Sequence, residues 1–274
     1  MICRENDEEF LLIRQHDHAL LAAELLGAVG NRMFSAPVPL GPVQLAVAQH
    51  DCAWPIHDDQ PTIRDGKPRH VFEMSIQTTM TIWQESVDRV AAQDPYAGLL
   101  VSLHVMGLAA IAAQHHQTPS RQEAFVSNRF FHRQIEIQEN LRRTLGMRID
   151  LPLRRGLAEP GRSPEEDLLR ANFFLLQWMD QISLVLCFGR LVIGGAQPVY
   201  PRPGGEPREA HIEPVEDAVF RVEPWPFERD RLDLEIPARR IPAREYADDA
   251  DLHAALASAK MEMTSAVLLR RAGV

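Results

Sequence analysis

The chain has 274 residues, of which 45% are hydrophobic and 24% are charged; these values are ordinary for a globular protein and exclude general disorder. The formal net charge is -9 at pH 7, and a uniformly acidic surface repels nucleic-acid phosphates and anionic membranes. Neither is therefore expected as a bulk partner, whereas a local basic pocket could still bind a small anionic substrate.

The cysteines and the apolar stretches indicate a cytoplasmic protein. The three cysteines are scattered, and they predict neither a disulfide framework nor a Cys-rich zinc site. The opening MICREND has no apolar core of the kind that a secretion signal needs. The most apolar stretches, residues 99–113 and 173–195, are interrupted by ionisable residues, so neither is expected to span a membrane.

Hydrophobic periodicity predicts mostly helices in the middle of the chain. A hairpin is expected over residues 1–14, followed by helices at about 16–27 and 41–51 and by a long loop rich in Pro and Gly. Longer helices are expected at 75–92, 95–116, 121–145 and 164–187. After a second break rich in Pro and Gly from residue 194, the pattern predicts strands at 218–222, 231–236 and 261–269, with a short helix at 249–257.

These elements predict a mainly α protein whose helical domain covers residues 14–193. Residues 1–13 and 208–274 are expected to form a small β-rich appendage packed on the same unit, with the sheet made by the N- and C-terminal segments. The closing strand at 261–269 could pair through its edge with a second copy of the chain, so a homodimer is also considered.

Three of the predicted helices each point an ionisable side chain into the core. His18, His50 and Asp180 lie three, four or seven residues from apolar residues of their own helix, which places each on a buried face. The apolar neighbours are Leu21, Ala22 and Leu25 for His18, Val43, Ala46 and Val47 for His50, and Phe173, Leu176, Leu184 and Cys187 for Asp180. An unpaired buried carboxylate is costly unless a cation compensates it.

Each of these residues alone has an ordinary explanation. An inward histidine is more often a hydrogen-bonded core residue, and an inward aspartate more often caps a backbone or pairs with arginine. Their joint occurrence favours a metal site, because one divalent cation would satisfy His18, His50, Asp180 and also Asp51, which directly follows His50. Two imidazoles and two carboxylates suit zinc, manganese, iron or nickel.

The order H…HD…D resembles that of the HD superfamily of metal-dependent phosphohydrolases, over roughly residues 14–187. The segments RQHDHALLAAEL, AVAQHDCAWPIHDDQP, YAGLLVSLHVMGL and FFLLQWMDQISLVLC, with the later EPWPF, also resemble an uncharacterised bacterial family of unknown function over nearly the whole chain. The HD resemblance implies an HD-like helical bundle with His18, His50, Asp51 and Asp180 as metal ligands. The second resemblance implies no particular chemistry.

The sequence departs from the HD pattern directly after the His-Asp pair. HD phosphohydrolases often continue HD-[IL]-G-[KH], whereas this chain continues HDCAW, so the Lys or His on the substrate side is missing. His57 and Asp58, slightly later in the loop, could replace it as general acid or substrate contact, or they could be solvated loop residues.

Four further residues are candidates for substrate binding. Trp54 could line the pocket, although aromatic residues at such spacing are usually part of the core. Arg14, Lys67 and Arg69 border the expected site in sequence and could hold an anionic substrate, although solvated surface charges are the more common case.

His104 also lies on an apolar helix face, which it shares with Ala97, Leu100, Val101, Leu108 and Ile111. It could complete the set of ligands of the first metal ion, bind a second ion or orient another ligand. It could equally be a plain core histidine.

The leading hypothesis is a metal-dependent hydrolase of a small phosphate ester or nucleotide. Metal-activated water would attack phosphorus, with Asp51, His57 and Asp58 as the catalytic residues. An alternative is an HD-fold non-haem di-iron oxygenase, for which His104 would supply a third histidine. A further alternative is a non-catalytic HD-like binding or regulatory module, which the residue missing after the His-Asp pair favours.

Overall fold

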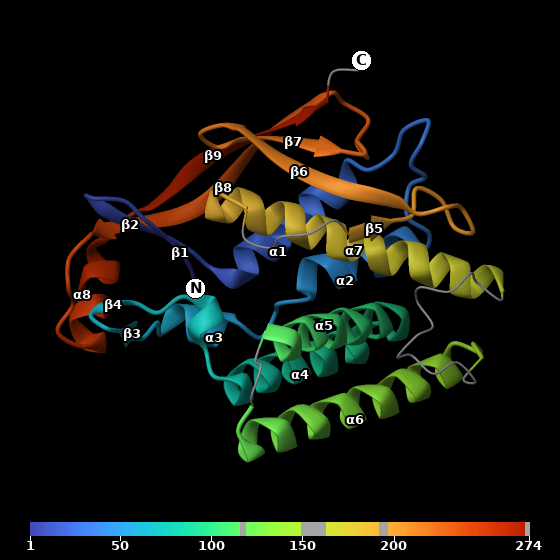
Figure 1. Cartoon of the computed structure of the whole chain (residues 1–274), viewed down its shortest axis with the longest axis horizontal. Coiled ribbons are helices and arrows are strands. Elements are labelled where there is room, and N and C mark those ends of the chain that lie inside the picture. The colour runs from blue at the N-terminus through green and yellow to red at the C-terminus, as the bar shows by residue number, and fades with distance from the viewer. Residues whose placement is uncertain (116–118, 149–162, 192–196, 272–274) are drawn as a thin grey trace.

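A seven-stranded mixed sheet curls over one side of the molecule (Figure 1). The computed structural model describes residues 1–115, 119–148, 163–191 and 197–271. The sheet contains β1 (Ile2–Glu5), β2 (Glu9–Ile13), β5 (Gln197–Val199), β6 (Arg208–Glu216), β7 (Val219–Glu223), β8 (Arg231–Pro242) and β9 (Met261–Arg270). The strand order is β1-β2-β8-β9-β7-β6-β5. Neighbours are antiparallel except for β7 and β9, which are parallel.

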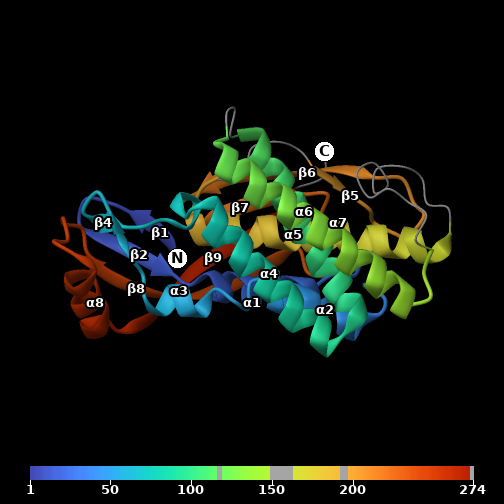
Figure 2. The ribbon, with the colours of Figure 1, turned by 90° about the horizontal axis from the view of Figure 1, so that it is seen from below.

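Helices cover one face of this sheet in layers (Figures 1 and 2). α1 (Gln15–Gly27) and α7 (Pro164–Phe188) pack against the strands. The next layer contains α2 (Leu40–Gln49), α4 (Ile76–Gln93) and α5 (Pro95–His115). α6 (Arg121–Thr144) lies outermost, against α4 and α5. The site described below lies where α1, α2, α5 and α7 meet.

Local sequence explains where the long helices begin and end. The hydroxyl groups of Ser75, Ser120 and Ser163 each accept a backbone N–H at the start of α4, α6 and α7, which satisfies a donor that the helix itself cannot pair. α7 ends at Gly189, whose φ of 65° is the left-handed conformation that glycine adopts without strain.

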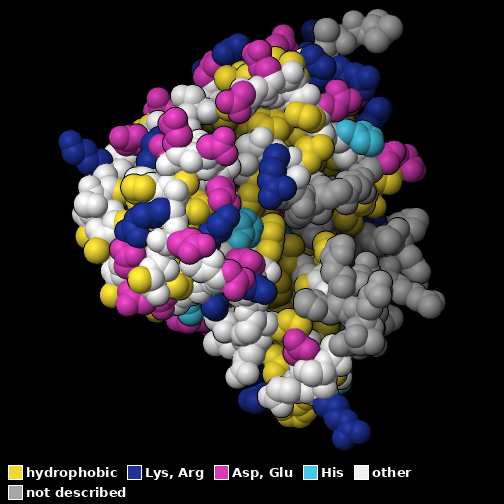
Figure 3. Space-filling model, turned by 60° about the vertical axis from the view of Figure 1, so that its left-hand side comes forward, with side chains coloured by type: hydrophobic (Ala, Val, Ile, Leu, Met, Phe, Trp, Pro, Cys, Tyr) yellow, Lys and Arg dark blue, Asp and Glu magenta, His cyan; other side chains and the backbone are white. Residues whose placement is uncertain are grey.

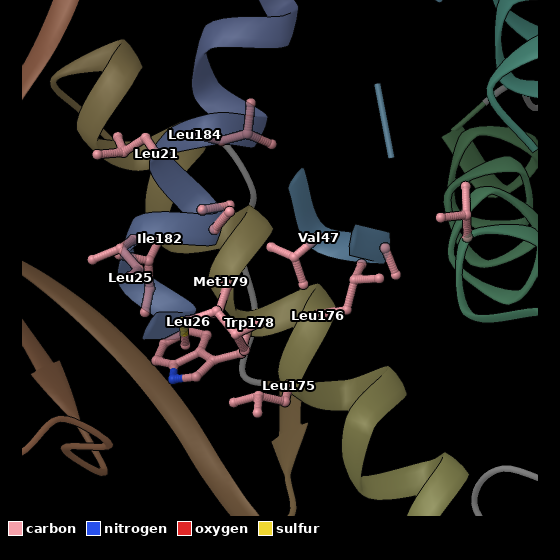
Figure 4. Close-up of a cluster of buried hydrophobic side chains, with 14 of the residues drawn as sticks. Leu21, Leu25, Leu26, Val47, Leu175, Leu176, Trp178, Met179, Ile182 and Leu184 are labelled. Atoms are coloured by element: carbon pink, nitrogen blue, oxygen red, sulfur yellow. The ribbon is translucent and has the colours of Figure 1, made fainter. Parts of the chain in front are cut away.

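The main hydrophobic core joins the helices to the sheet. Figure 4 shows α1 and α7 side by side in this core, with Leu25, Leu26, Trp178 and Ile182 packed between them. Strand residues, including Ile13, belong to the same core. Along β2 the side chains alternate, so that neighbouring residues point to opposite faces of the sheet. A smaller cluster on the opposite face lies under α8 (Asp249–Ser258) and contains Phe10, Leu12, Ile241, Leu252 and Leu256.

The long predicted loop contains small elements of its own. These are α3 (Pro55–Asp59), the two-stranded pair β3 (Ile63–Arg64) and β4 (Lys67–Pro68), and a 3-10 turn at Val71–Glu73. Beside α8 they form one end of the molecule (Figure 1). Figure 3 shows that acidic and basic side chains alternate over the surface at this end, next to a strip of hydrophobic side chains.

The predicted helices are confirmed, but the predicted fold class is wrong. The chain is not a mainly α, HD-like bundle with a small sheet, because seven strands form a large curled sheet that supports the helices. The break after residue 194 contains β5 and β6, which we did not predict. Only Ala210 is buried in β6, so this strand lacks the alternating apolar pattern by which strands are recognised.

The predicted strand at 261–269 is present as β9, but it is not at an edge. It lies between β8 and β7, which pair with both of its sides. The expected dimer contact through its edge is therefore not available.

Among the residues that the structure describes, two helices are long and apolar enough to cross a membrane by length and composition alone. They are α7 and the first 18 residues of α5. Within the protein, 89% of the α7 segment and 56% of the α5 segment are buried. Core helices of soluble proteins pass the same test, and α7 lies between the sheet and other helices (Figure 2).

Candidate metal centre

Four helices bring five ionisable side chains to one buried point. His18 lies near the start of α1, His50 caps the end of α2 and is followed by Asp51, His104 lies in α5, and Asp180 lies in α7. The side chains of the three histidines are 1% exposed, and those of the two aspartates are 7% exposed. The predicted burial of these residues is confirmed.

Three of these side chains form a triangle of donor atoms. Asp180 Oδ1 lies 3.1 Å from His18 Nε2 and 3.3 Å from His50 Nε2, and the two Nε2 atoms are 3.3 Å apart. For ligands about 2.1 Å from a shared ion, neighbouring ligand atoms lie roughly 3.0 Å apart in octahedral geometry and roughly 3.4 Å apart in tetrahedral geometry. The triangle could therefore hold one metal ion without rearrangement.

The backbone orients one of the two imidazoles for this role. His50 Nδ1 lies 2.7 Å from the carbonyl oxygen of Val47, one turn earlier. A carbonyl oxygen only accepts, so Nδ1 carries the proton and donates it. In the neutral ring, Nε2 then presents its lone pair to the triangle, which is the tautomer that a metal ligand requires.

Asp51 lies beside the triangle and offers a fourth donor atom, an oxygen. Its Oδ2 is 3.6 Å from His18 Nε2 and 3.9 Å from His50 Nε2. The carboxylate also accepts hydrogen bonds from Gln15 Nε2 at 3.2 Å and from Trp54 Nε1 at 3.1 Å. Asp51 is thus held close to the position of a fourth ligand.

The electrostatics of the cluster favour a cation. Burial alone lowers the pKa of His50, but the carboxylates of Asp51 and Asp180 outweigh it and raise that pKa to about 9. Burial raises the pKa of Asp180, yet hydrogen bonds from His18 and His50 hold it well below its usual range. The pKa of Asp51 is raised, chiefly by burial. A proton or a metal ion is therefore stabilised between these groups.

His104 approaches the cluster on the other oxygen of Asp180. Its Nε2 lies 3.7 Å from Asp180 Oδ2, and its ring centroid is 5.1 Å from that of His50. Burial lowers the pKa of His104 to about 3, so the ring is neutral. Neither ring nitrogen has a hydrogen-bond partner among the described residues. His104 thus faces Asp180 from outside the triangle.

The predicted catalytic residues of the loop lie near the cluster but do not join it. Asp58 is buried; its Oδ2 accepts the backbone N–H of Gln15 at 2.6 Å, and its Oδ1 lies 2.8 Å from the amino group of Met1. Because Gln15 opens α1, this contact fixes the start of the helix that carries His18. His57 lies in α3, with its ring centroid 6.2 Å from that of Trp54.

The predicted substrate-binding residues lie in three different places. Arg14 donates to Asp59 at 2.6 Å and borders, with Asp58, a cavity of about 270 Å³. Lys67 pairs with Glu5, and Arg69 donates to a backbone carbonyl of the β3–β4 pair. Trp54 is 2% exposed and donates to Asp51. Lys67 and Arg69 make no contact with the five clustered side chains among the described residues.

Sequence reasoning missed Gln15, which contacts both Asp51 and Asp58. A signal was present, because Gln15 precedes His18 by three residues and such residues share one helix face. A buried amide on the face of an inward histidine indicates a polar partner nearby.

Comparison with known proteins places the chain in a family. No curated protein and no solved structure matches it. Residues 1–243 match the family model described as "Protein of unknown function (DUF3891)", which agrees with the predicted resemblance to an uncharacterised family. The match does not confirm the resemblance to the HD superfamily. Since the matched residues make up most of the chain, this protein belongs to the DUF3891 family.

Proposed function

We propose that the protein is a metal-dependent hydrolase of a small phosphate ester or nucleotide. The observation that carries this proposal is the donor triangle of His18, His50 and Asp180, toward which His50 turns Nε2 because its Nδ1 donates to the backbone. Asp51 would be the fourth ligand, and the ion would be manganese, iron, zinc or nickel. When bound, an ion of this kind would lower the pKa of water and polarise a phosphoryl oxygen, so that water would displace the alcohol of the ester from phosphorus.

Two side chains near the buried cluster are suited to bind an anionic substrate. Arg14 and His57 lie near the start of α1 and in α3, close to Asp58 and Trp54. In this proposal they bind the anionic substrate or its leaving group. The three unpaired cysteines support a cytoplasmic location.

One observation favours a second candidate, a non-haem di-iron oxygenase. The buried nitrogens of His104 lack partners among the described residues, and Nε2 faces the second oxygen of Asp180 at 3.7 Å. A carboxylate can bridge two ions, so Asp180 could share its oxygens between the triangle and an ion on His104. Metal stoichiometry separates the two candidates, because the oxygenase requires two irons per chain.

The test is metal content and activity of the wild type and of Asp51→Ala. We expect one transition-metal ion per wild-type chain, together with hydrolysis of at least one member of a panel of phosphomonoesters, phosphodiesters and nucleotides. Asp51→Ala should lose both the ion and the activity. Asp88→Ala is the matched control, because Asp88 is an exposed carboxylate on α4 outside the cluster.

Two results would contradict the hydrolase. Full activity in well-folded Asp51→Ala would show that the reaction does not require the metal site. A wild type that stays free of metal after incubation with manganese, zinc, iron or nickel, and whose stability is unchanged by a chelator, would favour a non-catalytic module.

A further inference from the structure

We infer that Trp54 and Gln15 are positioning residues that hold the Asp51 carboxylate against the metal site and set its affinity for the ion. This inference rests on the proposed metal site, and it names two residues whose role is exerted through Asp51. Trp54 then acts on a metal ligand, and it need not touch the substrate.

The two donors hold Asp51 from both sides. Trp54 Nε1 donates to Oδ1 at 3.1 Å, and Gln15 Nε2 donates to Oδ2 at 3.2 Å. Oδ2 is the oxygen that faces the imidazoles of His18 and His50. With one donor on each oxygen, the carboxylate cannot turn about its Cβ–Cγ bond without losing a hydrogen bond inside the protein, where an unmade hydrogen bond is costly.

Both donors are themselves fixed. Trp54 is 2% exposed and Gln15 is also buried, so a change of rotamer would disturb the close-packed side chains around them. The backbone N–H of Gln15 donates to Asp58 at 2.6 Å, which ties the first residue of α1 to α3. Gln15 therefore connects the helix of His18 to the carboxylate of Asp51.

α4 anchors the turn that carries Asp51 and Trp54. Ser86 Oγ, fully buried, accepts the backbone N–H of Ala53 at 3.2 Å. Arg89 donates to the carbonyl oxygen of Cys52 at 3.0 Å. The backbone between Asp51 and Trp54 is thus held from a neighbouring helix, as expected where a ligand must be placed to within a fraction of an ångström.

The physical consequence concerns the affinity for the metal. Groups that hydrogen-bond a metal ligand orient it, and their removal typically weakens metal binding by about 10- to 100-fold. Asp51 Oδ2 is slightly farther from the imidazoles than Asp180 Oδ1 is. Its contribution to binding should therefore depend strongly on the groups that hold it.

The experiment measures Zn²⁺ affinity by competition with a chromophoric chelator in wild type, Trp54→Phe and Trp225→Phe. Trp225 is the matched control: it is 7% exposed, and its Nε1 donates to the carbonyl oxygen of Arg229 at 2.7 Å, in the segment after β7. Both variants lose one buried indole donor, but only Trp54→Phe loses one from a metal ligand. We expect a Kd about 10- to 100-fold weaker for Trp54→Phe and an unchanged Kd for Trp225→Phe.

A second variant and a spectroscopic measurement test the same inference independently. Gln15→Met removes the other donor but keeps the backbone contact with Asp58, and it should also weaken Zn²⁺ binding. In the wild type, the ¹⁵N-indole spectrum should contain one resonance for each of the four tryptophans. The Trp54 resonance should shift most when Zn²⁺ is added. If Trp54→Phe does not fold, removing the other tryptophans one at a time assigns this resonance.

The outcomes separate this inference from the proposed function. If the wild type binds metal and both Trp54→Phe and Gln15→Met bind it equally well, the positioning role is refuted and the metal site stands. The same conclusion follows if the Trp54 resonance does not move on saturation with Zn²⁺. If the wild type binds none of the four candidate metals, the proposed function is refuted, and the positioning role with it.

Discussion

Replacing Asp180 by asparagine tests the charge balance of the buried cluster in the absence of metal. In the metal-free protein, Asp180 is the anion closest to His18 and His50. The pKa of about 9 for His50 means that its ring carries a proton at pH 7. Asparagine keeps the shape of the side chain but removes one of the two carboxylate charges that stabilise this proton, so the pKa of His50 should fall toward its value in the unfolded chain.

The expected loss of stability follows from the proton that His50 no longer binds. The pKa of His50 is 6.5 in the unfolded chain and about 9 in the folded one, a difference worth about 2–3 kcal/mol at pH 7, and because Asp51 remains in the variant this is the upper limit of the loss. Because the folded pKa is the higher one, this contribution is fully present below pH 6.5 and is lost as the pH rises through about 9. The difference between wild type and Asp180→Asn should shrink accordingly.

Urea unfolding of chelator-treated protein at several pH values from 6 to about 10 measures this difference. The exposed Asp59→Asn is the control and should change stability by less than about 0.5 kcal/mol. A stability difference between wild type and Asp180→Asn that does not vary with pH would refute the proposed charge balance, as would the absence of any difference at pH 7.

Two further predictions concern parts of the fold away from the cluster. Gly98→Ala should destabilise the protein by about 1–3 kcal/mol in urea unfolding, because the new Cβ would lie 2.5 Å from Ala91 Cα on α4. Gly27→Ala is the control, since nothing lies within 4 Å of its new Cβ, and its free energy of unfolding should rise by up to about 1 kcal/mol. Equal effects of the two substitutions would contradict the close approach of α4 and α5. His70 packs on Phe188 with 4.9 Å between ring centroids, and burial lowers the pKa of His70 to about 4. The folded protein therefore resists protonation of His70, and the free energy of unfolding of the wild type should fall by about 1–2 kcal/mol, after allowance for solvent screening, as the pH falls from 6.5 to 4. His70→Phe should lack this acid-induced loss in chemical unfolding, and parallel pH profiles would count against the lowered pKa.

The ligand cluster could be predicted because its members lie on helices with strong apolar periodicity. Val47 and Leu176 are buried beside His50 and Asp180, and this spacing alone placed both ionisable groups inside. The precise roles could not be predicted in the same way. The proton on His50 Nδ1 depends on a carbonyl oxygen, and the separation of His104 from the triangle depends on which oxygen of Asp180 it faces.

The sheet was underestimated for a different physical reason. Helix signals are local, whereas a strand is stabilised by partners that can be distant in sequence. β2 pairs with β8 across more than two hundred residues. β6 is charged and mostly exposed, contains Pro214 and has an irregular register beside it, so its strand character comes from pairing with β7 and β5.

The position of β9 has a consequence for where the folding unit ends. The family match stops at residue 243, shortly after β8, but β9 (Met261–Arg270) is the strand that joins β8 to β7. A protein truncated after residue 243 would split the sheet into β1-β2-β8 and β7-β6-β5, each with a newly unpaired apolar edge of the kind that aggregates. During synthesis, the β1-β2-β8 and β7-β6-β5 parts of the sheet likewise cannot join until β9 has been made. Soluble expression of the matched region should therefore require residues to at least Arg270.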